Sequence, residues 1–236
     1  MRQRSVLVGL VGVLALVAVA CGGGGGGKDK AASSGSKEMV GLFQVDAGQC
    51  TTAGVTSGTY FRMIQPGGKP GAGPYLPNGD SPCGDKTYSP MFPGTAGGLM
   101  TGKFQAQASP PFDAGGNGVT DAIVKPTPFF AVKYANATNE EDPQTKAKTK
   151  LPTIVDNGGQ LSGDLSAFAA AWNNQHFNQG APKPNGEKPG LTAGPQGTYD
   201  QATKKYTLEW SSQIVGGPFN NFTGVWHFEG KFEPTA

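Results

Sequence analysis

Hydrophobic and polar residues alternate most regularly near the carboxyl end of the chain. In residues 206–211 every second side chain is large and apolar, and the same period continues in residues 222–232. There, one side of an extended chain would carry Phe222, Gly224, Trp226, Phe228, Gly230 and Phe232, and the other side Thr223, Val225, His227, Glu229 and Lys231. Such alternation is typical of strands with one buried face. We predict two antiparallel strands with an aromatic inner face, joined by a loop over residues 215–218 because Pro218 cannot sit in a central ladder.

Further short segments rich in β-branched and aromatic residues lie between clusters of turn-forming residues. They predict strands over residues 39–45, 59–64, 99–107, 129–134 and 152–155. The second of these ends at Gln65-Pro66-Gly67-Gly68, which is a turn signal.

One segment predicts a helix. Residues 164–172 are rich in alanine, and Leu165, Phe168 and Trp172 follow one another at spacings of three and four, which places them on one helical face. Asp164, the first residue of this segment, is a candidate N-cap. We expect this helix to dock its apolar face on the sheet.

Taken together, these elements predict a mainly β fold: a single antiparallel β-sandwich or open barrel with one short helix and long Gly/Pro-rich loops, in residues 38–236. The 38 glycines and 19 prolines gather in loops such as residues 65–98 and 180–197. No internal repeat is apparent. The 39 residues after the second loop are too few for a separate core, so we predict one domain.

The amino-terminal residues have the architecture of an export signal. Arg2 and Arg4 precede an unbroken run of apolar residues and glycine over residues 6–20, which ends in small residues before Cys21. This run of 15 residues is shorter than the roughly 20 that a spanning helix needs. We therefore predict a cleavable signal peptide over residues 1–20.

Ala18-Val19-Ala20-Cys21 resembles the bacterial lipobox, in which small residues precede a cysteine that receives a diacylglyceryl group. The usual lipobox has Leu where this chain has Ala18. The resemblance implies an acylated Cys21 that anchors the protein in the cell membrane, facing outwards. Residues 21–37 would then be a flexible Gly/Ser/Lys tether, whose composition is similar to that of lipoproteins from high-G+C Gram-positive bacteria.

The two other cysteines form an even pair once Cys21 is assigned to lipid. In an oxidising compartment we predict a disulfide between Cys50 and Cys83. The alternatives are two free thiols or a metal pair, and the second would need nearby histidines. The only histidines are distant in sequence.

The charge balance argues against nucleic acid as a partner. The chain has 19 basic and 17 acidic residues, a formal net charge of +2, and two of the basic residues lie in the predicted signal. Binding to nucleic acid by counterion release requires a basic surface, which this composition does not supply.

One polar cluster combines an aromatic ring with amides, as carbohydrate-binding surfaces do. It consists of Trp172, Asn174, His176 and Asn178, which are the candidate ligand-binding residues. The same residues would also fit a helix C-terminus that is capped by asparagine and leads into a loop.

Two loop clusters carry oxygen ligands of the type that calcium prefers: Asn78, Asp80 and Asp85, or Asp113 and Asn117. Neither matches the spacing of a known calcium loop, so Asx-turns are the default interpretation. We predict no metal site and no cofactor.

No catalytic motif is present around the two histidines, His176 and His227. There is no Gly-x-Ser-x-Gly, no His-Glu-x-x-His and no phosphate-binding glycine loop followed by Lys-Ser/Thr. We assign no catalytic residue, and expect His227 to be exposed or paired across strands.

Residues 210–219 and 226–230 are similar to stretches in exported bacterial proteins of unassigned function, so the resemblance transfers no site residues. The leading expectation is a non-enzymatic, membrane-anchored binding or envelope module for a carbohydrate, peptide or protein partner. The alternatives are a cell-envelope hydrolase that acts on carbohydrate or peptidoglycan, and a structural or assembly lipoprotein without a small ligand.

Overall fold

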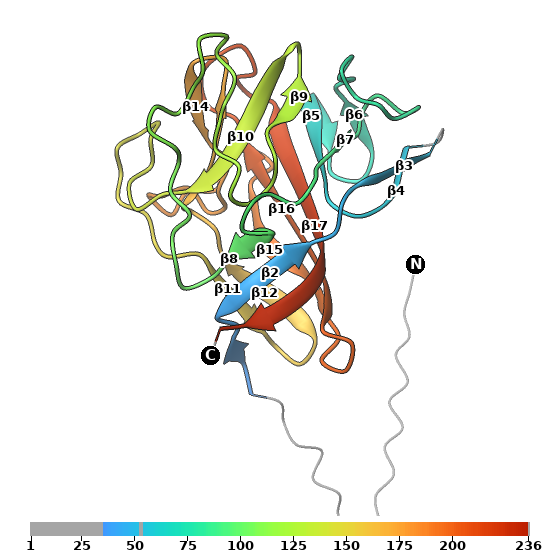
Figure 1. Ribbon diagram of the computed structural model, residues 1–236, viewed down its shortest axis with the longest axis vertical. Coiled ribbons are helices and arrows are strands. Elements are labelled where there is room, and N and C mark those ends of the chain that lie inside the picture. The colour runs from blue at the N-terminus through green and yellow to red at the C-terminus, as the bar shows by residue number, and fades with distance from the viewer. Residues whose placement is uncertain (1–34, 52–53, 236) are drawn as a thin grey trace, which may run out of the picture. The chain divides into compact units, whose positions relative to one another are not determined.

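A large antiparallel sheet dominates the computed structural model, which describes residues 35–51 and 54–235 (Figure 1). Eight of its strands lie in the order β1 (Lys37–Glu38), β11 (Thr153–Asp156), β12 (Gln160–Asp164), β15 (Ala193–Tyr199), β16 (Lys205–Gln213), β17 (Thr223–Pro234), β2 (Gly41–Val45) and β8 (Gly98–Met100). Three more strands belong to this sheet. Strand β5 (Tyr60–Lys69) pairs with β17, and β6 (Gly73–Tyr75) and β7 (Ser89–Pro90) each pair with β5.

A smaller antiparallel sheet packs on the inner face of the large one. Its order is β14 (Gln175–Asn178), β13 (Phe168–Trp172), β10 (Val132–Thr138) and β9 (Thr127–Phe129). Rings from both sheets meet in the core, where the Phe168 ring lies 5.0 Å from Trp210 and 5.1 Å from Trp226. The fold is thus mainly β, as the sequence predicts.

Strand β17 lies at the centre of the large sheet. One flank pairs with β16 from Thr223 to Lys231. The other flank is shared, because β5 pairs with the first part of β17 and β2 with the last part, from Gly230 onwards. Trp226, Phe228 and Phe232 are buried, so the predicted pairing and the predicted aromatic inner face are both confirmed.

The predicted helix over residues 164–172 is wrong, because residues 168–172 form strand β13. Its alanines are explained by burial on both faces rather than by helix propensity. Ala171 and its cross-strand partner Ala135 lie against Gly118. A Cβ added to Gly118 would come within 2.5 Å of the Ala171 carbonyl oxygen and 2.7 Å of the Ala135 Cβ. Only small side chains leave room for this covering segment.

Most other predicted strands exist with shifted ends. Strand β5 continues to Lys69 through the expected turn, and β8 ends at Met100 instead of residue 107. Residues 129–134 contain a hairpin turn between β9 and β10, in which Phe130 and Ala131 have φ angles of 52° and 62°. The segments over residues 39–45 and 152–155 correspond to β2 and β11.

The predicted disulfide between Cys50 and Cys83 is confirmed. It joins a small hairpin, β3 (Gln49–Thr51) with β4 (Gly54–Ser57), to the loop that precedes β7. The predicted signal peptide, the lipid site at Cys21 and nearly all of the tether lie outside the described residues, although the last tether residue, Lys37, belongs to β1. Within the described ranges, no helix is long and apolar enough to cross a membrane.

Candidate functional site

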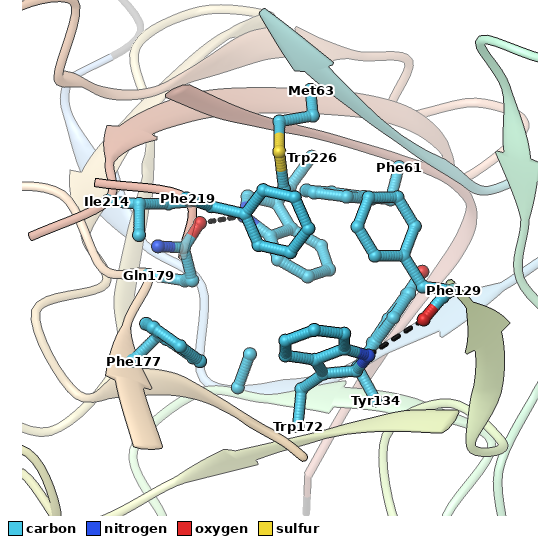
Figure 2. A pocket seen from close by; sticks show the side chains of 11 residues that line it. Phe61, Met63, Phe129, Tyr134, Trp172, Phe177, Gln179, Ile214, Phe219 and Trp226 are labelled. Carbon is cyan, nitrogen blue, oxygen red and sulfur yellow. Dashed lines mark hydrogen bonds between the residues drawn. The ribbon is translucent and has the colours of Figure 1, made fainter. Parts of the chain in front are cut away.

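An apolar cavity, which we call the aromatic cavity, lies between the two sheets, where the small sheet faces β5 and β17. Its walls are lined mainly by large apolar side chains from both sheets and from the loop between β16 and β17 (Figure 2): Phe61, Met63, Phe129, Tyr134, Ala170, Trp172, Phe177, Ile214, Phe219 and Trp226, together with Gln179. The cavity volume is about 40 Å³. A water molecule needs roughly 10–15 Å³, but an apolar lining of this kind keeps a cavity dry.

The side-chain N–H groups of the two tryptophans in the wall already have hydrogen-bond partners. Trp172 Nε1 donates to the Phe129 carbonyl at 2.8 Å, and Trp226 Nε1 donates to Gln179 Oε1 at 3.3 Å. These bonds fix the orientation of both rings. The Tyr134 hydroxyl is buried without a hydrogen-bond partner among the described residues, and burial raises its pKa, so it is a neutral group. The cavity therefore offers apolar contact rather than charge.

Phe219 closes the cavity from the side of the β16–β17 loop. Its half-buried ring lies 5.3 Å from Trp172 and 5.6 Å from Phe129. The loop contains Gly216 and Gly217 at φ angles of 79° and 65°, a conformation that favours glycine. Hydrogen bonds hold the tip of the loop as well, because Asn220 Oδ1 accepts from the Gly216 N–H at 2.7 Å and the Phe219 carbonyl accepts from the Phe222 N–H at 3.0 Å.

The base of this loop is well ordered. The backbone N–H of Ile214 donates to the Phe222 carbonyl at 2.8 Å, and that of Asn221 donates to the Ile214 carbonyl at 3.0 Å. Gln144 Nε2 also donates to the Val215 carbonyl at 2.7 Å. Because both the base and the tip of the loop are hydrogen-bonded, a movement of Phe219 would be confined to its side chain.

A second aromatic side chain, Phe130, borders the Phe219 ring at 5.6 Å and is 42% exposed. It is held in a left-handed conformation at the β9–β10 turn, which is rare for a bulky residue. The loop between β6 and β7 supports this turn, because Asn78 Oδ1 accepts from the Phe130 N–H at 3.4 Å and Asp80 Oδ2 accepts from the Ala131 N–H at 2.5 Å. The exposed Phe130 ring thus extends the apolar surface beyond Phe219 on this side of the cavity.

The four candidate residues from the sequence do not come together. They lie on the β13–β14 hairpin, whose turn is formed by Asn173 and Asn174 at φ angles of 50° and 56°. Trp172 lines the cavity, whereas Asn174 is exposed at the turn. His176 packs against Phe112, and burial lowers its pKa.

Asn178, the fourth candidate, is buried with its amide fully engaged. Its Nδ2 donates to Asp142 Oδ1 at 3.2 Å and to the Ser166 carbonyl at 3.0 Å, while its Oδ1 accepts from the Gly180 N–H. This amide supports the local structure and leaves no free group for a ligand.

The loop carboxylates adopt the Asx geometry that was the default interpretation. Asp113 Oδ1 accepts from the N–H groups of Gly115 and Asn117, and the bond to the Asn117 side chain is the main reason that the pKa of Asp113 is lowered. Asp85 Oδ1 accepts from the Thr87 N–H in the same way. In the part of the chain that the structure describes, no group of three or more His, Cys, Asp or Glu side chains is placed to hold a metal ion.

Sequence reasoning missed most of the cavity, including Phe219 and Phe129. Phe219 directly follows Gly216-Gly217-Pro218, and an aromatic residue in such a loop was a usable signal. No family model matches this chain, and neither a curated protein nor a solved structure matches it.

Proposed function

We propose that the protein is a non-enzymatic binding protein, held at the outer face of a membrane by lipid on Cys21, whose aromatic cavity receives the apolar group of a small ligand. The observation that carries the binding role is the convergence of rings from both sheets on one apolar space. Ligand sites are commonly apolar and concave, with few polar groups. The membrane address is supported by the amino-terminal sequence alone.

The ligand would enter by displacing Phe219. The cavity of about 40 Å³ is small beside the engineered cavity of roughly 150 Å³ that binds benzene. When the Phe219 side chain rotates outwards, the space that it occupies between Trp172 and Phe129 joins the cavity. The ligand group then makes the ring contacts that Phe219 makes in the closed form.

The binding role is tested by titrating the protein with 1-anilinonaphthalene-8-sulfonate and, separately, with medium-chain fatty acids, while tryptophan fluorescence is recorded. Trp172 and Trp226 line the cavity and should respond directly. Ala170→Leu fills the cavity and should weaken binding at least tenfold, whereas Phe219→Ala should strengthen it. Ala202→Leu, the same change at an exposed position, is the matched control and should leave binding unchanged.

Equal binding by the wild type and the Ala170→Leu variant would refute the cavity as the binding site. Near-UV circular dichroism must show that each variant keeps its packed core, since both tryptophans report on it.

The membrane address needs a separate test. Mass spectrometry of the native protein should find the leader removed and Cys21 acylated, and Cys21→Ser should release the protein from the membrane fraction. An unmodified Cys21, or a leader that is still attached, would refute the anchoring.

A further inference from the structure

The outer face of the large sheet carries a second hollow, on the side opposite to the aromatic cavity. Its floor is built from two rows of side chains that cross neighbouring strands. The first row is Gln196, Glu209, His227 and Tyr60, and the second is Ala193, Ser211, Val225 and Arg62. Directly paired residues point to the same face, so each row lies together on the outer side.

We call this hollow the tyrosine groove; its volume is about 200 Å³. Tyr75 and the tip of the β5–β6 hairpin, at Pro70 and Gly71, form one side, while Ala193 and Gln196 of β15 form the other. A register shift in β15 between these last two residues shapes this side of the groove.

The side chains of the groove are held rigidly before any ligand arrives. The Arg62 guanidinium carbon lies 3.3 Å from the centroid of the Tyr75 ring and 4.1 Å from that of Tyr88. Its Nη2 donates to Thr87 Oγ1 at 2.9 Å and its Nη1 to the Tyr88 hydroxyl at 3.3 Å. The Tyr60 ring is also fixed between neighbours, because it stacks on His227 at 4.6 Å and meets the edge of Tyr88 at 5.0 Å. Rigid side chains reduce the entropy lost on binding.

The charges that line the groove balance. Arg62 supplies one positive charge and Glu209 one negative charge, and the adjacent His227 has a carboxylate of its own, because its Nε2 lies 3.4 Å from Glu229 Oε2 while its Nδ1 lies 3.6 Å from Glu209 Oε2. A ligand with a net charge would find no excess of the opposite sign here. The balance therefore favours a neutral ligand.

Hydrogen-bond donors and acceptors both surround an apolar surface in the groove. Glu209 can only accept, Gln196 can donate and accept, and the Tyr60 hydroxyl remains a donor because burial and the nearby Glu209 raise its pKa to about 12. Val225 and the tyrosine rings provide the apolar surface. A sugar ring presents the matching pattern, with C–H groups on its face and hydroxyls around its edge.

We infer that the tyrosine groove binds one ring of a neutral carbohydrate, independently of the aromatic cavity. Its volume of about 200 Å³ is below the 300–1,000 Å³ of sites that hold drug-sized ligands, so the groove fits one ring rather than an extended chain.

The test is a titration of the protein with glucose, galactose, mannose and N-acetylglucosamine, each followed by protein NMR. Glucuronic acid and glucosamine serve as charged comparisons. At least one neutral sugar should give saturable shifts at Tyr60, Tyr75 and Gln196, with a dissociation constant on the order of 1 mM, which corresponds to about −4 kcal/mol. The charged sugars should bind at least fivefold more weakly.

Two variants and one control assign the site. Gln196→Ala and Glu209→Gln each remove a contact at an exposed or partly exposed position and should weaken sugar binding at least fivefold. Gln160→Ala, an exposed glutamine on β12, should have no effect. No saturable shift with any neutral sugar, a preference for a charged sugar, or equal binding by all three variants would overturn the inference. Ala170→Leu, which fills the aromatic cavity, should leave the sugar response intact, so each site can fail without the other.

Discussion

Removal of the Cys50–Cys83 disulfide should lower the free energy of unfolding by about 3–4 kcal/mol. The two cysteines are 33 positions apart, and closing a loop of that length restricts the unfolded chain by this amount on the chain-entropy model. The variant is Cys50→Ala with Cys83→Ala, made in a Cys21→Ser background so that no third thiol can exchange.

Urea unfolding followed by tryptophan fluorescence measures this loss, since Trp210 and Trp226 are buried in the core. Most of the effect should come from the unfolded state. The free energy of unfolding should therefore fall more steeply with urea concentration in the variant, whose unfolded chain exposes more surface. The wild type in reducing agent should match the variant.

A loss below about 1 kcal/mol would refute this reasoning, because it would mean that other contacts already restrain the loop. Such contacts include those of Asn78, whose Nδ2 donates to Ser89 Oγ at 2.9 Å and to the Pro128 carbonyl at 3.0 Å. An Asn78→Ala variant with the disulfide intact measures that contribution separately.

Three further predictions concern single side chains. Ala135→Leu should destabilise the fold by about 1–3 kcal/mol in thermal or urea unfolding, because Gly118 lies so close to the Ala135 Cβ that a larger side chain has no room. Although burial lowers the pKa of His227, the hydrogen bonds and charges of Glu209 and Glu229 outweigh it and raise the pKa above 6.5. This group therefore stabilises the fold most below that pH and loses its contribution as the pH rises through the raised pKa, so His227→Gln should flatten the pH dependence of unfolding in this window. Burial lowers the pKa of Lys183 to about 8, and an NMR titration of its side chain should find a midpoint there rather than near 10.5.

The carboxyl-terminal strands could be predicted from sequence because their pattern is local. Each of Tyr206, Leu208 and Trp210 is buried, and the period of two identifies the inner face without knowledge of the partner strand. The same pattern placed Val225, His227 and Glu229 together on the outer face, where Val225 and His227 contribute to the two rows of the tyrosine groove.

The error at residues 164–172 has a physical cause. A strand that is covered on both faces shows no alternation, and alanine is favoured there because space is limited, whereas a helix favours alanine because it loses no side-chain entropy. Asn173-Asn174 was the signal that could have corrected the prediction. Asparagine tolerates the left-handed conformation that a two-residue hairpin turn requires.

Neither the aromatic cavity nor the tyrosine groove could be assembled from sequence. The cavity combines Phe61, Trp172 and Phe219, and the tyrosine groove combines Tyr60 with Gln196 and Glu209. These residues come from distant parts of the chain, and their proximity depends on strand order, which local periodicity does not specify. Of the four candidates, Trp172 is the one that lines the aromatic cavity.

The central position of β17 has a consequence for how the protein reaches its final form. Phe43 pairs with Phe232, and Phe61 pairs with Trp226, so two early strands have no place in the large sheet until β17 is present. Contacts between such distant segments slow folding. In the export proposed above, a chain that crosses a membrane amino end first would therefore complete its large sheet only after its last long strand, β17, had emerged.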